Sequence, residues 1–155
     1  MWDDPGVEWN SLGAVVVRST WDYHRHREAY LAWAEGLATL LPLWNPIGTL
    51  RWNSHKSYLS RMGLDGIPVV PTETGRAGET LQALAARRGW SDLVVKPAVS
   101  AGAESTFHVR AGEYAKAEES YRRALSAGEQ LVQPYVTELD ETGEHSLVYF
   151  NGVYS

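Results

Sequence analysis

Lysine is scarce in this chain of 155 residues, so the position of each lysine is informative. The chain has only Lys56, Lys96 and Lys116, and arginine serves as its usual surface cation. Lys96 stands inside residues 93–97, an apolar run that predicts a β-strand. An unpaired ammonium group is costly to bury, so Lys96 must reach an anion or a cleft. A strand-edge lysine whose end reaches water would meet the same requirement.

A loop of small residues follows this strand at positions 99–103. Ser100, Ala101 and Gly102 carry nothing bulky, so their backbone N–H groups could approach phosphate oxygens closely. The loop is not a Walker P-loop, because it lacks that motif's spacing and joins two predicted strands. An ordinary hairpin loop has the same composition, so phosphate binding is one of two interpretations.

Two later features could contact a nucleoside. Gln133, Pro134, Tyr135 and Val136 end a predicted strand, where main-chain groups could meet the edge of an adenine. Glu144 precedes an apolar run, where a carboxylate could accept hydrogen bonds from ribose hydroxyls. Taken alone, these residues fit better a strand that stops at Pro134 and a solvated acid in a loop.

Polar residues also follow the first apolar run, residues 13–18, which predicts a buried parallel strand. Arg18, Ser19 and Thr20 would lie past the carboxyl end of that strand, where ligands of open α/β sheets bind. Arg18 could hold a substrate carboxylate through two hydrogen bonds. The same residues fit equally well a loop that enters a helix capped by Thr20 or Asp22.

The remaining pattern predicts a mixture of helices and strands. Ser54 is expected to cap a helix that carries Lys56 and ends at Gly63 and Gly66. A hairpin turn is expected at Asn151 and Gly152, leading into a strand that begins at Val153. The other predicted helices are residues 30–41, 78–88 and 114–127, and the other predicted strands are residues 68–72, 106–110, 130–136 and 145–150.

Composition excludes several classes of protein. Hydrophobic residues make up 44% of the chain and charged residues 21%, as in globular proteins. The net charge of −5 and the absence of a Lys/Arg cluster argue against nucleic-acid binding. With no cysteine there is no disulfide or Cys-based zinc site. No apolar run is long enough for a membrane span or a signal peptide, so we expect a cytoplasmic protein that does not bind membranes.

The order of these features resembles the ATP-grasp superfamily. The resemblance is closest to the glutathione-synthetase-like branch that includes the O-ureido-serine cyclo-ligase. It runs over nearly the whole chain from about Val15, and its most specific parts are the Lys96 loop and residues 18–23. The stretches that carry it are residues 17–23, 44–46, 51–56, 94–103 and 132–135.

The resemblance implies an ATP site with Mg²⁺ and a small carboxylate or amino-acid-like substrate, and it leaves a homo-oligomer open. Lys56 and Lys96 would hold the α- and β-phosphates, and the Ser100, Ala101 and Gly102 amides would cover them. The residues expected to meet adenine and ribose are Gln133, Pro134, Tyr135, Val136 and Glu144. Those expected to face the substrate are Arg18, Ser19, Thr20, Asp22 and Asn53.

The resemblance also implies an incomplete ATP-grasp fold of the α+β or α/β class. Residues 1–45 would be a remnant of the N-terminal α/β domain and residues 46–130 the central subdomain with its glycine-rich loop. Residues 131–155 would be the hinge and the start of the C-terminal subdomain. The magnesium ligands would lie beyond Ser155, so this chain would hold none, and residues 1–155 alone are expected to be inactive.

The activity implied is that of an ATP-dependent carboxylate–amine or cyclising ligase that acts through an acyl phosphate. Such chemistry needs positioning and electrostatic stabilisation rather than a covalent nucleophile, and no residue of this chain is assigned as catalytic. The alternatives are a phosphotransferase on the same fold and a non-catalytic nucleotide-binding module.

Overall fold

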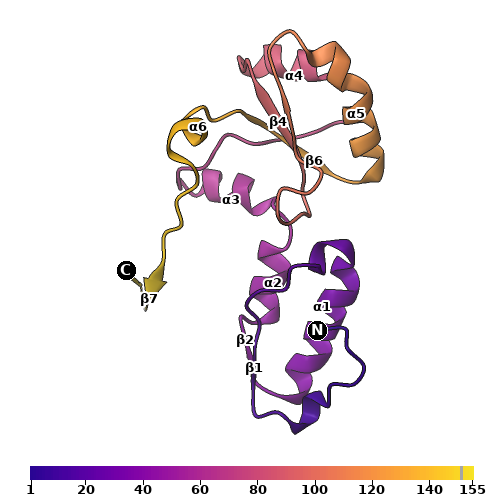
Figure 1. Ribbon diagram of the computed structural model, residues 1–155, viewed down its shortest axis with the longest axis vertical. Coiled ribbons are helices and arrows are strands. Elements are labelled where there is room, and N and C mark those ends of the chain that lie inside the picture. The colour runs from indigo at the N-terminus through magenta and orange to yellow at the C-terminus, as the bar shows by residue number, and fades with distance from the viewer. Residues whose placement is uncertain (151) are drawn as a thin grey trace.

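The computed structural model describes residues 1–150 and 152–155, so the turn expected at Asn151 lies outside the described residues. Two units follow one another along the chain, and Figure 1 shows them one below the other. We call residues 1–53 the N-terminal unit and residues 58–134 the sheet unit. A tail that includes a small C-terminal hairpin follows the sheet unit and extends away from it (Figure 1).

The N-terminal unit is built around one long helix. Its elements are η1 (Trp9–Ser11), β1 (Val15–Val16), η2 (Tyr23–Arg25), α1 (Arg27–Leu40), β2 (Leu43–Trp44) and α2 (Ile47–Asn53). Strand β1 pairs with β2 in parallel, as the valine-rich run predicts. The prediction that β1 is buried on both faces is wrong, because Val16 is 58% exposed. The core lies on the α1 side, where Val17, Tyr30, Leu31, Ala34 and Leu50 are buried.

The sheet unit holds a larger sheet of four antiparallel strands. Its elements are α3 (Tyr58–Leu64), β3 (Glu73–Thr74), α4 (Leu81–Arg88), β4 (Leu93–Pro97), β5 (Phe107–Val109), α5 (Tyr114–Ala127) and β6 (Gln130–Pro134). The strand order is β3-β6-β4-β5. The predictions of a strand at 93–97 and a helix at 114–127 are confirmed to the residue.

Helices α4 and α5 cover one face of this sheet, where they share a core with alternate residues of the strands. Leu93 and Val95 of β4 are fully buried in that core, and Tyr121 of α5 and Leu84 of α4 pack with them. Successive side chains of a strand point to opposite faces. Val94 and Lys96 therefore point to the other face of the sheet.

The expected start of a helix at Ser54 is wrong, although a helix does form over the later part of that stretch. Helix α2 ends at Asn53 and Ser54 is its C-cap, while α3 begins only at Tyr58. Lys56 therefore lies in the turn between two helices, where its backbone N–H donates to the Ala98 carbonyl at 2.7 Å. Because that amide is bonded across to the end of β4, it is not available to a continuous helix. Gly63 lies inside α3 instead of ending it.

The strand expected at residues 68–72 is also wrong. Pro68 and Pro71 have no N–H to give to a sheet. The chain joins the sheet only at β3, where Glu73 pairs with Val132 and Thr74 with Leu131.

The C-terminal part departs from the sequence prediction in three places. Strand β6 ends at Pro134, two residues earlier than expected. Residues 137–144, the acidic stretch between two predicted strands that the sequence predicts as a loop, contain a short helix, α6 (Glu138–Thr142). The strand expected over residues 145–150 is only β7 (Tyr149–Phe150), which pairs with β8 (Val153–Tyr154). None of the helices in the described ranges combines the length and apolar character needed to cross a bilayer.

Candidate functional site

A cavity of about 580 Å³ lies on the face of the sheet opposite α4 and α5. Val94 and Lys96 line it, whereas Leu93 and Val95 from the same strand lie in the core. The volume is within the range typical of small-molecule sites. All ten residues that the sequence predicted to contact ATP line this one cavity: Lys56, Lys96, Ser100, Ala101, Gly102, Gln133, Pro134, Tyr135, Val136 and Glu144.

Lys96 is held in this cavity by its place in the middle of the sheet. Its strand, β4, pairs with β5 on one side and β6 on the other, so the backbone position is rigid. Burial lowers the pKa of the Lys96 ammonium group, and the Glu144 carboxylate acts in the opposite direction. Desolvation disfavours the charged form, and a nearby anion restores it. An anionic ligand would therefore stabilise the protonated Lys96.

Lys56 enters the same cavity from the turn between α2 and α3. Its Nζ donates to the Ser100 carbonyl at 2.6 Å and to Ser100 Oγ at 2.7 Å. Burial lowers the pKa of Lys56, and repulsion by Lys96 lowers it further. The charged side chains that line the cavity in the described part of the chain are these two lysines and Glu144. The cavity thus carries an excess of positive charge, which favours an anion.

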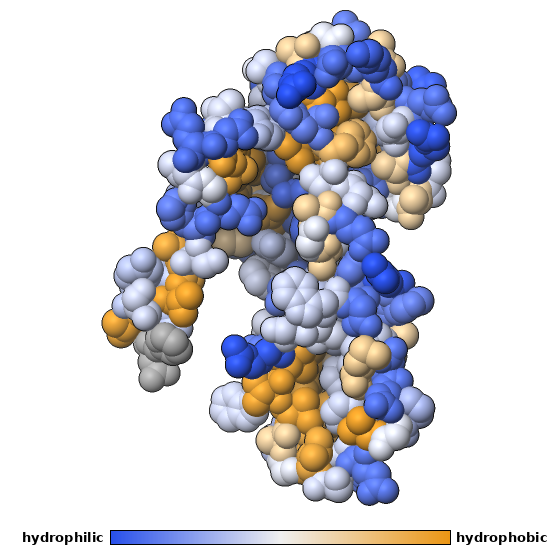
Figure 2. All heavy atoms as spheres, in the orientation of Figure 1, coloured by the Kyte–Doolittle hydropathy of each residue, from blue (hydrophilic) through white to orange (hydrophobic). Residues whose placement is uncertain are grey.

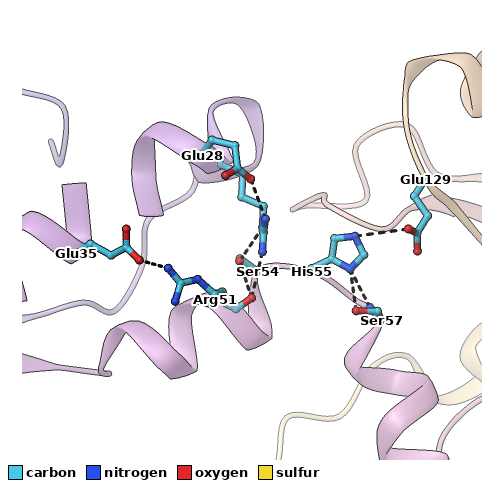
Figure 3. A network of polar contacts seen from close by, with 8 residues as sticks. Glu28, Glu35, Arg51, Ser54, His55, Ser57 and Glu129 are labelled. Atoms are coloured by element: carbon cyan, nitrogen blue, oxygen red, sulfur yellow. Dashed lines mark hydrogen bonds and ion pairs between the residues drawn. The ribbon is translucent and has the colours of Figure 1, made fainter. Parts of the chain in front are cut away.

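The turn that carries Lys56 is held from both units by polar contacts (Figure 3). Arg27 Nε donates to Ser54 Oγ at 2.9 Å, just before the lysine. On the other side, His55 Nε2 lies 3.9 Å from the Glu129 carboxylate, at the start of β6. These contacts join residues far apart in the sequence, and no local pattern in the sequence indicated them.

The loop after β4 lines the cavity with residues whose backbone amides are unpaired within the described part of the chain. No backbone carbonyl of residues 1–150 or 152–155 accepts a hydrogen bond from the amides of Ser100, Ala101, Gly102 or Ala103. Gly102 and Ala103 have φ angles of 59° and 58°, so consecutive residues occupy the left-handed region. Adjacent unbonded amides in such a turn form a concave surface suited to anions.

The strand end after β6 is more constrained than the sequence suggested. Gln133 Nε2 donates to Thr72 Oγ1 at 2.7 Å, so this side chain already has a partner. The Tyr135 N–H donates to the Asp92 carbonyl at 2.8 Å and is not available to an adenine. The Val136 N–H has no backbone acceptor within the described ranges, which leaves it as the available main-chain donor at this edge.

The residues expected to face the substrate are only partly brought together. Arg18, Thr20 and Asn53 line a separate cavity of about 180 Å³ in the N-terminal unit. Ser19 and Asp22 do not line it, and Asp22 Oδ1 instead accepts a hydrogen bond from Trp2 Nε1 at 2.9 Å. Of the described residues, none lines both this cavity and the cavity that holds Lys56 and Lys96.

Another cavity, of about 880 Å³, lies between the two units and not at the lysine pair. It is lined by His24, Arg27 and His55 from one side and by the C-terminal end of α5 from the other. Among the residues that the structure describes, Thr106 alone lines both this cavity and the one that holds the lysines. We place the functional site at the lysines, because charge and free amides converge there.

Two sequence comparisons bear on this geometry. The family model for the N-terminal domain of D-cycloserine synthetase DcsG matches residues 1–45. The cycloserine biosynthesis protein DcsG of Streptomyces lavendulae is 32% identical over 160 residues, covering 99% of this chain and 54% of that protein. The chain thus spans about half the length of this curated relative.

Solved structures agree with the sequence comparisons. The crystal structure of D-cycloserine synthetase DcsG matches with a TM-score of 0.86 at 33% identity, over 99% of this chain and 54% of that one. A RimK-domain ATP-grasp protein from Sphaerobacter thermophilus has a TM-score of 0.60 at 24% identity, over 81% of this chain and 46% of that one. The D-alanine–D-alanine ligase of Coxiella burnetii has a TM-score of 0.56 at 21% identity, over 80% and 37% of the two chains.

The last two structures support the fold alone, since their identities are low, whereas the match to DcsG holds in both sequence and structure. The chain is therefore a homologue of about half of the D-cycloserine synthetase DcsG, and its fold is an incomplete ATP-grasp fold.

Proposed function

We propose that this chain forms most of the ATP site of an ATP-dependent ligase that joins a carboxylate to an amine. The observation that carries the proposal is the single cavity in which Lys56, Lys96 and the free amides of residues 100–103 converge. Two ammonium groups and several N–H donors suit a polyphosphate, because each oxygen can take a charge-assisted hydrogen bond. The homology to DcsG, a synthetase by name, supports a ligase.

In this proposal the nucleotide lies along the face of the sheet. Lys96, Lys56 and the 99–103 loop hold the phosphates at one end of the cavity. Val136, at the other end, offers its N–H to the adenine, and the side chains of Tyr135 and Leu139 give the base apolar surface. Glu144 accepts hydrogen bonds from the ribose and also lies near enough to Lys96 to affect its pKa.

When bound, ATP would supply a phosphoryl group that activates a carboxylate as an acyl phosphate, which an amine then attacks. The residues of this chain would contribute by holding charge in place. The lysines would stabilise negative charge that builds up on the phosphate oxygens as ADP leaves. The amides of the loop would exclude water from the phosphates, so that the acyl phosphate reacts with the amine instead.

Magnesium would accompany ATP, because it is usually bound through one or two carboxylates and the phosphates of the substrate. Residues 1–150 and 152–155 hold no group of three or more His, Cys, Asp or Glu side chains that could bind a metal ion. The protein ligands of magnesium are proposed to lie outside the described residues.

The substrate is proposed to be amino-acid-like, with Arg18 holding its carboxylate and Thr20 and Asn53 beside it. The names of the relatives favour this class of substrate. The name D-cycloserine synthetase also favours ring closure within one molecule over the joining of two molecules. We retain the domain division at residues 45 and 130 and the cytoplasmic location as parts of the same proposal.

The test is to trap the acyl phosphate in the full-length protein that contains this chain. ATP, Mg²⁺, hydroxylamine and O-ureido-serine or D-alanine are incubated together, and hydroxamate and ADP are measured. We expect hydroxamate in proportion to ADP with at least one of the two substrates. Release of ADP with no hydroxamate would indicate a phosphotransferase, and ATP binding without any ADP would indicate a binding module.

A further inference from the structure

The loop that would cover the phosphates is tied to the N-terminal unit by an ion pair that no local sequence pattern indicates. Glu104 follows Ala103 directly, and its Oε2 lies 2.8 Å from His24 Nε2 and 3.5 Å from Arg25 Nη2. Both partners belong to η2, eighty residues earlier in the chain. One acidic side chain thus joins the loop to a different unit of the molecule.

The loop needs such a support. Besides Gly102, two residues with side chains, Ala103 and Ser105, have φ angles of 58° and 59°. A left-handed conformation is unfavourable for residues with a Cβ and persists when surrounding contacts impose it. Within the loop, backbone bonds span only Glu104 to Ala101 and Thr106 to Ala103. Local turns alone are therefore a weak support for this conformation.

The two ends of the loop are held by different parts of the chain. At its start, Lys56, from the turn between the two units, binds Ser100 through the carbonyl and the hydroxyl. At its end, His24 and Arg25 of the N-terminal unit bind Glu104. Residues 101–103, between these supports, line the cavity and have backbone amides that are unpaired among the described residues.

The anchor for Glu104 is itself rigid. The His24 side chain is only 11% exposed and packs edge-on against Tyr23, with ring centroids 6.0 Å apart. Asp22, the N-cap residue of η2, accepts a hydrogen bond from the indole N–H of Trp2. His24 can therefore fix the position of Glu104, although Glu104 is half exposed.

We propose that Glu104 is a positioning residue. Its contacts with His24 and Arg25 would hold the loop, taken here as residues 99–105, over the phosphate end of the cavity. The N-terminal unit would then control how well the loop amides are aligned with a phosphate. The expected effect of Glu104 on ATP binding rests on the proposed function. The expected effect of Glu104 on the order of the loop does not.

The first measurement follows hydrogen exchange at the amides of Glu104 and Thr106, which are hydrogen-bonded within the loop, in the protein without nucleotide. Glu104→Ala and His24→Ala are expected to speed this exchange several-fold. The double variant is expected to be no faster than Glu104→Ala alone, because that variant already removes the contacts with both His24 and Arg25. Glu119→Ala is the matched control, since Glu119 is 83% exposed on α5 and pairs with Arg123. Exchange unchanged by Glu104→Ala would overturn the proposal.

The second measurement compares the affinities for ATP and for adenosine. Glu104→Ala should weaken ATP binding by about 3- to 10-fold, a range between exposed and well-formed charge-assisted bonds. Adenosine affinity should stay the same, because the loop would contact only phosphates. An equal loss for both ligands would overturn the proposal, since it would place the effect outside the loop.

The two measurements also separate this inference from the proposed function. If the wild-type protein does not bind ATP, the proposed function fails, and the exchange experiment still decides whether Glu104 orders the loop. If Lys96→Ala abolishes ATP binding while Glu104→Ala changes neither exchange nor affinity, the proposed function stands and Glu104 has no positioning role.

Discussion

The β-sheets of the two units differ in how completely their side chains are buried. In the sheet unit, four strands and two helices enclose a core whose largest members, among them Tyr121, Leu84 and Leu93, have no exposed surface. In the N-terminal unit, the two-stranded sheet has its core on one face and leaves Val16 58% exposed. Figure 2 shows the corresponding apolar surface on the lower unit.

This difference indicates which unit fixes the positions of the side chains in the candidate site. Lys96 and the 99–103 loop belong to the closely packed sheet unit, so their positions follow from a rigid core. The N-terminal unit contributes through polar contacts at the boundary, with Arg27 on Ser54 and His24 on Glu104. We infer that the sheet unit forms the site and that the N-terminal unit adjusts it.

The difference in burial is tested most directly by truncating one β-strand residue in each unit. Leu93→Ala in β4 should lower the free energy of unfolding by about 3 kcal/mol, because it opens a cavity in a fully buried site. Val16→Ala in β1 should cost less than about 0.5 kcal/mol, since most of that side chain is already in water. Urea denaturation followed by circular dichroism measures both, and equal losses would mean that the units do not differ as described.

A smaller effect is expected from adding one methyl group beside the core of the sheet unit. A Cβ on Gly75 would lie 2.6 Å from Tyr121 Oη and 3.0 Å from Leu125 Cδ2, so both side chains on α5 must move. Gly75→Ala should therefore destabilise the protein by about 1–3 kcal/mol.

The matched control is Gly13→Ala in the N-terminal unit, where an added Cβ would meet nothing within 4 Å. That variant should be neutral or slightly stabilising, because alanine restricts the unfolded chain. Thermal unfolding of both variants tests the pair, and a tolerated Gly75→Ala would show that α5 packs less closely on β3 than the structure indicates.

The smallest expected effect is the contribution of the buried Lys96 ammonium group to the pH dependence of stability. Burial lowers the pKa of Lys96 from its ordinary value of 10.5, so the folded protein loses this proton at a lower pH than the unfolded chain does. The free energy of unfolding should therefore rise as the pH increases toward 10.5. Lys96→Met should reduce this rise and stabilise the ligand-free protein at neutral pH by about 1 kcal/mol or less.

Lys116→Met is the control for this measurement, because Lys116 is 81% exposed on α5. Its unfolding curves between neutral pH and pH 10 should match those of the wild-type protein. If Lys96→Met shows the same pH dependence as the control, burial of Lys96 does not affect stability.

The elements with strong local signals could be predicted from the sequence. The valine-rich strand with Lys96 and the alanine-rich helix α5 were placed to the residue, because hydrophobic periodicity and clear end signals agree there. The ten proposed ATP contacts came from a family resemblance, and the structure brings all of them to one cavity. Their role in binding ATP stays a prediction.

The errors occurred where contacts distant in sequence decide the local structure. Lys56 was expected on a helix, but its amide is bonded to Ala98, and nothing near Lys56 in the sequence reveals that bond. The same holds for the support of Glu104 by His24, which joins two units across eighty residues. Residues 68–72 resembled a strand in composition, yet their prolines and the register of β6 moved the pairing to Glu73 and Thr74.

The central claim is that Lys56 and Lys96 jointly bind a triphosphate, and calorimetric titration of ATP with Mg²⁺ tests it most directly. Replacing all three lysines one at a time gives the comparison, with Lys116→Ala as the control. We expect Lys56→Ala and Lys96→Ala each to weaken ATP binding by roughly 10- to 100-fold, the effect of losing a charged hydrogen-bond donor, and Lys116→Ala to leave it unchanged. Wild-type affinity in Lys96→Ala would contradict the account.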